Sequence, residues 1–331
     1  VVVGASMIFG GISGSAIADS AAIGSVMIKN MSRERYNTAF AAGLVAAAGT
    51  IGIIIPPSIP MLIYGFVGNV SVADLFLGGM VPGILFGALF MAVCYYVGKT
   101  TKCDPGGRTT TFKELTSSFI GTAPALFMPI VILGGIFTGW VTPTEAAALA
   151  VVYGLFVTTV VYRDFKLRDL PRLLIDSFVT SAVVMVVIGA TTVLGWLITL
   201  EQMPQILVGF VQAFSTGPWM FLLLVNVVLL VLGLVLDPVP AILLTAPLFL
   251  PTAQAFGVDP VHLGVIMTCN VAVGLFTPPV GATLYVASRI SGVGVLSIAR
   301  NMAPLYIAAI AALLAVTYIP FLSMGMVNLF R

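Results

Sequence analysis

The sequence has very little charge. Only 8% of its 331 residues are charged, against roughly 25% in soluble domains, while 60% are hydrophobic. A water-soluble globule needs a charged surface, so this composition excludes one. The mean hydropathy of +1.14 points the same way. We therefore expect an integral membrane protein that is surrounded by a lipid bilayer.

Histidine and cysteine are also scarce. The single histidine, His262, and three widely spaced cysteines exclude a disulfide framework and a clustered transition-metal site. The basic residues form no dense block and the formal net charge is only +2, so we expect no nucleic-acid partner. A complete phosphate-binding loop is missing too, because Val93 stands where the motif ending in Gly98-Lys99-Thr100 needs a glycine. We expect no ATP and no other cofactor.

Uncharged stretches of about 20 residues or more recur along the chain, and nearly all basic residues lie between them. A helix of that length can cross a bilayer, so we expect an all-α polytopic membrane protein. Short loops rich in Lys and Arg stay in the cytoplasm, which places residues 99–118 and 163–172 inside. Counting crossings from these loops, residues 202–258 start and finish outside. They form a hairpin whose first half is the uncharged run Gln202–Leu236 and whose turn lies at Asp237.

One sequence pattern occurs twice, at a constant offset of 222 positions. It is a glycine, three further residues, a Pro-Pro pair and a leucine. Its two copies are Gly52, Pro56, Pro57 and Leu62, and Gly274, Pro278, Pro279 and Leu284. An odd number of expected crossings separates the copies, so one copy is inverted relative to the other. Inverted repeats are typical of secondary transporters, which bind substrate near the midplane between the repeats.

Each copy predicts a helix that is interrupted within the membrane. A proline deletes a backbone N–H and clashes with the preceding turn, so a Pro-Pro pair breaks a helix and frees carbonyl oxygens. Freed carbonyls suit cations, and the N-termini of half-helices attract anionic groups. Upstream of the first copy, the small residues 10–16 separate two apolar arms that are too short to span, which predicts a re-entrant hairpin. The turn at Asp237 predicts a second re-entrant hairpin.

These features divide the chain into four parts. The first repeat, a re-entrant hairpin plus a broken helix, covers residues 1–67, and the second, inverted repeat covers residues 201–288. Residues 68–200 form connecting and scaffold helices, and residues 289–331 form a C-terminal loop and helix. Because residues 1–3 include neither an initiator methionine nor a charged leader, we interpret the chain as a fragment or a processed product.

Three motifs carry a resemblance to a known family. They are FGGISGSAIADSAAIG (Phe9–Gly24), GTIGIIIPPS (Gly49–Ser58) and GLFTPPVG (Gly274–Gly281). They resemble the large membrane subunit of tripartite ATP-independent periplasmic (TRAP) transporters, and the resemblance runs along essentially the whole chain. It implies an elevator-type transporter in the bacterial cytoplasmic (inner) membrane that imports an organic acid by Na⁺ symport. It also implies a periplasmic binding protein and a small membrane subunit as partners, and leading helices that precede this segment.

The resemblance further implies two cation sites, for Na⁺ only. The first would be built by Ser13, Gly14, Ser15, Gly52, Pro56, Pro57 and Ser58. Its inverted counterpart would be built by Asp237, Gly274, Thr277, Pro278 and Gly281. Asp19, four residues past Ser15, either faces the first site or bonds to a neighbouring helix, and both possibilities stay open.

The basic residues also bear on substrate binding. No Lys or Arg lies within any uncharged stretch, so a substrate carboxylate meets no buried guanidinium in this chain. We expect helix N-termini, bound cations and the hydroxyls of Ser15, Ser58 and Thr277 to hold it instead. Asn270, which aligns with an alanine in the first copy, is expected to contact either substrate or cation. Asn226, within an apolar stretch, is expected to bond to a neighbouring helix.

Two other functions are alternatives. Gly11-Ile12-Ser13-Gly14 matches the pattern around the nucleophile of rhomboid-type intramembrane serine proteases. The histidine that such a dyad needs would be His262, the single histidine in the sequence. A lone histidine near the outer end of a helix is more typical of a solvated or capping residue. An ion channel would need a filter shared by several subunits or a ring of charges, and the sequence shows neither.

Overall fold

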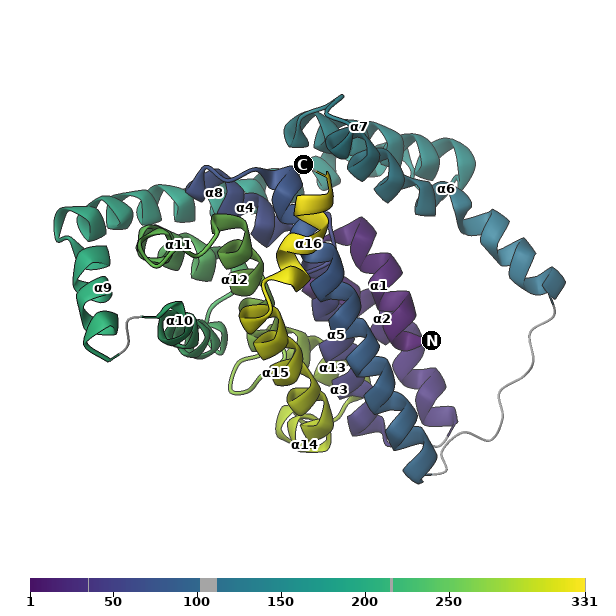
Figure 1. Ribbon diagram of the computed structural model, residues 1–331. Helices are drawn as coiled ribbons and strands as arrows, with labels where there is room; N and C mark the ends of the chain where they lie inside the picture. The colour runs from purple at the N-terminus through teal and green to yellow at the C-terminus, as the bar shows by residue number, and fades with distance from the viewer. Residues whose placement is uncertain (35, 102–111, 215–216, 331) are drawn as a thin grey trace. The chain divides into compact units, whose positions relative to one another are not determined.

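All the described secondary structure is helical, as the sequence predicted. The computed structural model describes residues 1–34, 36–101, 112–214 and 217–330, and no strand occurs within them (Figure 1). Among the described helices, five are long and apolar enough to cross a membrane, or up to eight if each of three bent pairs makes one span. The structure therefore has the character of a polytopic membrane protein.

The chain divides into two compact units, and the larger consists of residues 1–105 and 190–331. Its first part contains α1 Val2–Ser13, α2 Ala16–Arg33, α3 Thr38–Gly49, the 3₁₀ helix η1 Thr50–Ile53, α4 Ile59–Gly68 and α5 Val72–Thr101. Its second part contains the end of α8 (Leu170–Leu200), α9 Met203–Phe214, α10 Pro218–Gly233, α11 Pro238–Ala255, α12 Pro260–Gly274, α13 Ala282–Ser291, α14 Val295–Asn301, α15 Ala303–Tyr318 and α16 Phe321–Phe330.

The two interrupted helices form much of the core of this unit. Residues 39–49 of α3 and residues 261–274 of α12 are all buried, as expected for helices that are apolar all round. Each helix ends shortly before its Pro-Pro pair, and the chain resumes as a second helix, α4 or α13. The helices thus break where the sequence predicted. The peptide bonds Pro56-Pro57 and Pro278-Pro279 are both cis.

Capping residues position the starts of both interrupted helices. Asn37 Oδ1 accepts a hydrogen bond from the Ala39 amide at 2.8 Å at the start of α3. Asp259 Oδ1 accepts one from the Val261 amide at 2.7 Å at the start of α12. These bonds satisfy amides that have no partner within the first helical turn.

The larger unit has two halves, one in each of its two chain segments. The helix that follows each Pro-Pro pair, α4 in the first half and α13 in the second, packs against a helix of the other half. Helix α4 packs against α11, and α13 packs against α2. Under the offset of 222 positions, α2 corresponds to α11 and α4 to α13, so the two contacts are equivalent. In the same way, α3 packs against α1 and α2, and α12 packs against α10 and α11 (Figure 1).

A buried hydrogen bond joins the two halves. Tyr64 of α4 is fully buried, and its hydroxyl donates to the Pro260 carbonyl of α12 at 2.8 Å. Because such a bond contributes about 1 kcal/mol, Tyr64→Phe should lower the Tm of the detergent-solubilised protein by about 2 °C. Tyr318→Phe is the matched control, since the Tyr318 hydroxyl reaches the Trp219 carbonyl only at 3.5 Å. Equal losses in the two variants would contradict a stabilising role for the Tyr64 bond.

The smaller unit consists of residues 106–189. It contains α6 Phe112–Phe137, α7 Pro143–Phe156, the π-helical turn η2 Val157–Val161, the 3₁₀ turn η3 Leu167–Asp169 and the start of α8. A capping box begins α7: the Thr142 hydroxyl accepts from the Glu145 amide, and the Glu145 carboxylate accepts from the Thr142 amide at 2.8 Å. The Tyr153 hydroxyl donates to the Pro124 carbonyl at 2.7 Å, which ties α7 to α6.

The prediction for the first half of the second hairpin is wrong. The uncharged run Gln202–Leu236 is not a single half of a hairpin, because it contains both α9 and α10. Helix α10 begins at Pro218, with Gly217 as its N-terminal cap. A proline is tolerated at the first position of a helix but not within its interior, and it therefore separates the two helices.

Three expected loops contain more helix than the sequence suggested. In the loop 99–118, α5 continues to Thr101 and α6 begins at Phe112, and residues 102–111 lie outside the described residues. The loop 163–172 contains η3 and the start of α8. The C-terminal part 289–331 contains α14, α15 and α16, and the last two are bent by 52° at Pro320, which cannot continue a helix.

Candidate functional site

The predicted tip of the first hairpin is a tight turn between α1 and α2. Gly14 has φ 60°, a left-handed conformation that glycine adopts without a steric penalty. Ser15 then caps α2, since its Oγ accepts from the Ala18 amide at 3.4 Å. The Ser15 amide donates to Ser13 Oγ at 3.1 Å. Residues 13–15 thus form one hydrogen-bonded turn.

This tip rests against the first interrupted helix at backbone distance. A Cβ atom added to Gly14 would lie 2.7 Å from the Pro57 carbonyl oxygen. A Cβ atom added to Gly10 would overlap the Cα atom of Gly52. Because backbone cannot move aside as a side chain can, only glycine fits at these positions. The structure therefore brings the hairpin tip together with the break assigned to the first site.

Asp19 meets both descriptions that the sequence left open, because it bonds to the neighbouring helix α1 and also lies against the first break. It is fully buried on α2, and its Oδ1 accepts a hydrogen bond from the Ser13 hydroxyl of α1. Its Oδ2 has no hydrogen-bond partner and lies against Gly52, where an added Cβ atom would overlap it. A buried carboxylate with a single partner is costly unless a positive charge accompanies it.

The first Pro-Pro pair frees two carbonyls and the structure satisfies one of them. Pro56 and Pro57 have no N–H, so the carbonyls of Gly52 and Ile53 lose their helical donors. Ser58 Oγ donates to the Ile53 carbonyl at 2.5 Å and also caps α4. The Ser58 hydroxyl therefore stabilises the break, and the Gly52 carbonyl is the other oxygen that loses its helical donor to the proline pair.

The second Pro-Pro pair is resolved differently. The carbonyl of Leu275 accepts from the Thr283 amide at 3.1 Å and from the Thr283 hydroxyl at 2.9 Å. The Gly274 carbonyl accepts from the Thr277 amide at 3.0 Å, and the Thr277 hydroxyl donates to a carbonyl of α12. In the turn after α12, the Gly274 and Leu275 carbonyls therefore accept hydrogen bonds from Thr277 and Thr283. In the turn after α3, the Ile53 carbonyl, which corresponds to that of Leu275, accepts from Ser58 instead.

Glycine contacts also bring the second hairpin to the second break. A Cβ atom added to Gly274 would lie 2.6 Å from the carbonyl carbon of Gly233, at the end of α10. Gly281, with φ 50°, closes the turn that follows Pro278. Asp237 lies between α10 and α11, and its side chain is exposed and does not cap α11. The backbone segments assigned to the second cation site therefore lie together, whereas the Asp237 carboxylate assigned to that site is exposed.

The two asparagines that the sequence singled out contact each other. Asn270 is fully buried on α12, and its Nδ2 donates to Asn226 Oδ1 on α10 at 2.5 Å. Asn226 Nδ2 donates to Thr317 Oγ1 on α15 at 3.1 Å. The expected role of Asn226 in joining helices is confirmed. Asn270 Oδ1 is buried and has no hydrogen-bond partner.

His262 is neither solvated nor a partner of Ser13, so the expectation of a solvated histidine is wrong. The alternative of a capping histidine fits, because its ring bonds to the Thr317 carbonyl in the last turn of α15. His262 is only 3% exposed, because α12 is buried from its first turn. Its Nε2 lies 3.2 Å from the Thr317 carbonyl and its Nδ1 lies 2.6 Å from Ser323 Oγ. Ser13 instead bonds to Asp19. The two residues of the supposed protease dyad therefore have other partners.

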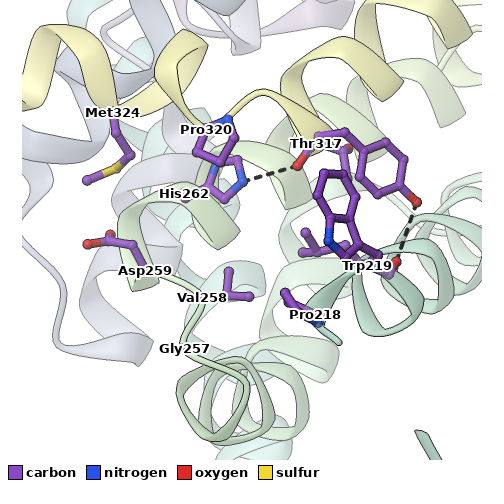
Figure 2. Close-up of a pocket in the computed structure, with 11 residues that line it drawn as sticks. Pro218, Trp219, Gly257, Val258, Asp259, His262, Thr317, Pro320 and Met324 are labelled. Carbon is purple, nitrogen blue, oxygen red and sulfur yellow. Dashed lines mark hydrogen bonds between the residues drawn. The ribbon is translucent and has the colours of Figure 1, made fainter. Parts of the chain in front are cut away.

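A pocket of about 280 Å³ opens beside His262, between the starts of α10 and α12 and the bend between α15 and α16 (Figure 2). Trp219 and Tyr318 stack on one side of it, with ring centroids 5.2 Å apart. Its walls are mostly apolar, and none of the residues predicted for the cation sites lines it. The pocket and the predicted ion sites are therefore separate features.

The donor atoms near the first break suit a hard cation. Within the described part of the chain, no group of three His, Cys, Asp or Glu side chains is placed to hold a metal ion. The first break instead brings the Asp19 carboxylate and the Ser13 hydroxyl together beside Gly52, whose carbonyl lacks its helical donor. Oxygen ligands of these types are the ones that hard cations prefer.

Comparison with known proteins identifies similar chains along the whole length. The family model described as the tripartite ATP-independent periplasmic transporter, DctM component, matches residues 1–322. A C4-dicarboxylate TRAP transporter large permease protein of Pseudomonas aeruginosa is 42% identical over 324 residues, which cover 98% of this chain and 76% of that protein. A sialic acid TRAP transporter large permease protein of Vibrio cholerae is 39% identical over 329 residues, covering 98% and 76%. A 2,3-diketo-L-gulonate TRAP transporter large permease protein of Escherichia coli is 35% identical over 316 residues, covering 96% and 74%.

Proposed function

Because the chain belongs to the DctM component family of tripartite ATP-independent periplasmic transporters, we propose that it imports an organic acid by Na⁺ symport. In this proposal a periplasmic binding protein delivers the substrate, and a small membrane subunit completes the transporter. The observation that carries the proposal is the glycine-rich hairpin tip, which packs with the buried Asp19 against an interrupted helix.

Family membership decides the class of protein. The chain is a multi-span permease subunit of the bacterial inner membrane and is not an enzyme. The protease alternative is therefore wrong, in agreement with the separate partners of Ser13 and His262. The channel alternative is not favoured either, since the relatives are named as transporter permeases.

The exchange of partners between the two halves supports an inverted repeat. Two copies related by a two-fold axis contact each other reciprocally, as α4 with α11 and α13 with α2 do. With the odd number of crossings that the sequence predicts between the copies, that axis would lie in the membrane plane. Inverted-repeat transporters alternate access by moving one part of the protein against another. We propose that the two hairpins and the two interrupted helices move together, as the mobile domain of an elevator.

Two Na⁺ sites follow from the two breaks. In the first, we assign the Ser13 hydroxyl, the Asp19 carboxylate and the Gly52 carbonyl as ligands, because Asp19 bonds to Ser13 and lies against Gly52. The second is assigned to the turn around Thr277 and Gly281, where the Gly274 carbonyl accepts one hydrogen bond and keeps a second lone pair for the ion. A substrate anion in a site of low dielectric is costly until a cation compensates its charge. Bound Na⁺ therefore promotes substrate binding, and this electrostatic linkage is the proposed coupling.

The substrate is proposed to be a carboxylate, in line with the acids that name the relatives. The hydroxyl protons of Ser58 and Thr277 already go to backbone carbonyls, so these hydroxyls are not free to donate to it. The amides at the N-terminus of α2, beside Ser15, and of α4 are the better donors, because helix N-termini attract anions. We expect Ser58 and Thr277 to act indirectly, by holding the two breaks.

Uptake by proteoliposomes tests the proposal. The permease and its small subunit are reconstituted together, the cognate binding protein is added outside, and a panel of labelled acids is offered with an inward Na⁺ or K⁺ gradient. We expect saturable uptake of at least one acid that requires both Na⁺ and the binding protein, and that a Na⁺ ionophore collapses. Equal uptake with K⁺ would exclude Na⁺ symport, and a conductance without saturable uptake would favour a channel.

A further inference from the structure

A row of buried polar side chains crosses the part of the larger unit that follows residue 190. All of its members are at most 3% exposed, and they lie on four different helices. They are Asn226, His262, Asn270, Thr317 and Ser323. Buried polar groups in an otherwise apolar membrane protein are costly unless they are paired, and they frequently mark functional sites. All but one of the hydrogen-bonding atoms of the two amides are paired, and the exception is Asn270 Oδ1.

The direction of each hydrogen bond between these side chains follows from the Thr317 hydroxyl, which lies at one end of the row. The Thr317 hydroxyl has one proton and two acceptors within reach, the Leu313 carbonyl at 2.8 Å and Asn226 Oδ1 at 3.4 Å. The shorter bond takes the proton, so toward Asn226 the hydroxyl accepts. Asn226 must therefore turn its Nδ2 to Thr317 and its Oδ1 to Asn270. Asn270 must in turn present its Nδ2 to Asn226. The second proton of Asn270 Nδ2 goes to the Ile266 carbonyl at 3.3 Å.

One consequence is that Asn270 Oδ1 is held as a free acceptor. If the Asn270 amide were reversed, two oxygen atoms would face each other at Asn226 and the bond would be lost. The orientation of Asn270 thus depends on Thr317, a residue 47 positions away that contacts it only through Asn226. Figure 2 shows that His262 fixes the same part of α15 by bonding to the Thr317 carbonyl.

The free oxygen lies close to the second break. Asn270 is one helical turn before Gly274, or about 6 Å along the axis of α12. Gly274 begins the turn to which the second site is assigned in the proposed function. The corresponding position in the first half is Ala48, so this acceptor belongs to the second half alone. An amide oxygen is a neutral hard ligand, which suits a cation better than an anion.

We propose that Asn226 and Thr317 are positioning residues that orient the Asn270 amide, so that Asn270 Oδ1 serves as a ligand of the second Na⁺ ion. This inference rests on the proposed Na⁺ symport and specifies one of its sites. It predicts that Na⁺ affinity depends on the hydroxyl of a residue that does not touch the ion. A purely structural network would instead affect stability and leave Na⁺ affinity unchanged.

The test measures Na⁺ binding without substrate, through the rise in Tm that a ligand of the folded state produces. The purified permease with its small subunit is heated in a Na⁺ series at constant ionic strength. We expect Thr317→Val to raise the half-saturating Na⁺ concentration about tenfold, because the Asn226 amide loses the acceptor that orients it. Thr317→Ser, which keeps the hydroxyl, should restore the value of the unmodified protein.

Two further variants separate orientation from general loss of packing. Thr268→Val is the matched control, since Thr268 is equally buried on α12 and its hydroxyl donates to the Gly264 carbonyl of its own helix. It should leave half-saturation within about twofold of the unmodified protein. In an Asn270→Ala background, Thr317→Val should have no further effect on Na⁺, as expected for residues that act through one another.

The outcomes distinguish the inference from the proposed function. If Na⁺ does not raise the Tm of the unmodified protein, the proposed Na⁺ symport fails. If Na⁺ raises it and Thr317→Val lowers only the starting Tm, the network is structural and the inference is wrong. If Thr317→Val changes substrate affinity at saturating Na⁺ but not Na⁺ binding, Asn270 contacts the substrate, and the inference is again overturned.

Discussion

Gly52→Ala is expected to abolish uptake. The added methyl group would overlap Asp19 Oδ2 and would lie 2.9 Å from the Cα atom of Gly10, so neither the hairpin nor the interrupted helix could keep its place. Overpacking a close backbone contact costs about 3 kcal/mol, at the upper end of such penalties. We expect uptake below about a tenth of that of the unmodified protein, measured in proteoliposomes with equal amounts of inserted protein.

Gly4→Ala is the control for this substitution. Gly4 lies on α1, in the same hairpin, and a Cβ atom there would have no neighbour within 4 Å. Alanine is the better helix former, so this variant should insert and transport at least as well as the unmodified protein, within about twofold. If Gly52→Ala transports as well as Gly4→Ala does, the hairpin tip does not pack on the break during transport.

Asp19→Asn is expected to weaken Na⁺ coupling strongly. The amide can still accept from the Ser13 hydroxyl, so the substitution removes the negative charge while it keeps the size and the hydrogen bond. A charge about 5 Å from a cation contributes roughly 3 kcal/mol at an effective dielectric constant of 20. We therefore expect the Na⁺ concentration for half-maximal uptake to rise about 100-fold. The measurement is initial uptake rate against Na⁺ at constant ionic strength.

Asp259→Asn is the matched control for charge removal. The Asp259 carboxylate caps α12, and asparagine caps a helix about as well as aspartate does. Its Na⁺ dependence should match that of the unmodified protein. An Asp19→Asn variant with the same Na⁺ dependence as this control would mean that the buried carboxylate does not face a transported cation.

Much of the fold was predictable because its causes are local. A Pro-Pro pair lacks two adjacent N–H groups wherever it occurs, so the breaks after α3 and α12 follow from the sequence alone. The same chemistry explains two errors. Pro218 starts a helix and Pro320 ends one, but each stands alone within an apolar run, whose hydropathy by itself predicts one continuous segment.

The candidate site was predictable only in part. The glycine and serine motif around Ser13 indicated a turn, and the structure confirms that turn. The status of Asp19 could not be settled, because its burial depends on Gly10 and Gly52, which lie on other segments of the chain. Thr317 was missed, since a threonine within an apolar helix gives no signal of its own when its partner is 91 positions away.

Composition and local motifs thus established a helical membrane protein with two interrupted helices, because lipid leaves the backbone few ways to satisfy its hydrogen bonds and proline removes one of them. The tertiary structure alone decided which side-chain oxygen atoms of the described residues are enclosed and unpaired, and Asp19 Oδ2 and Asn270 Oδ1 are two of the four, beside Ser6 Oγ and Ser20 Oγ. These atoms owe their isolation to close packing between segments that are distant in the chain, and no periodicity in the residues encodes such packing.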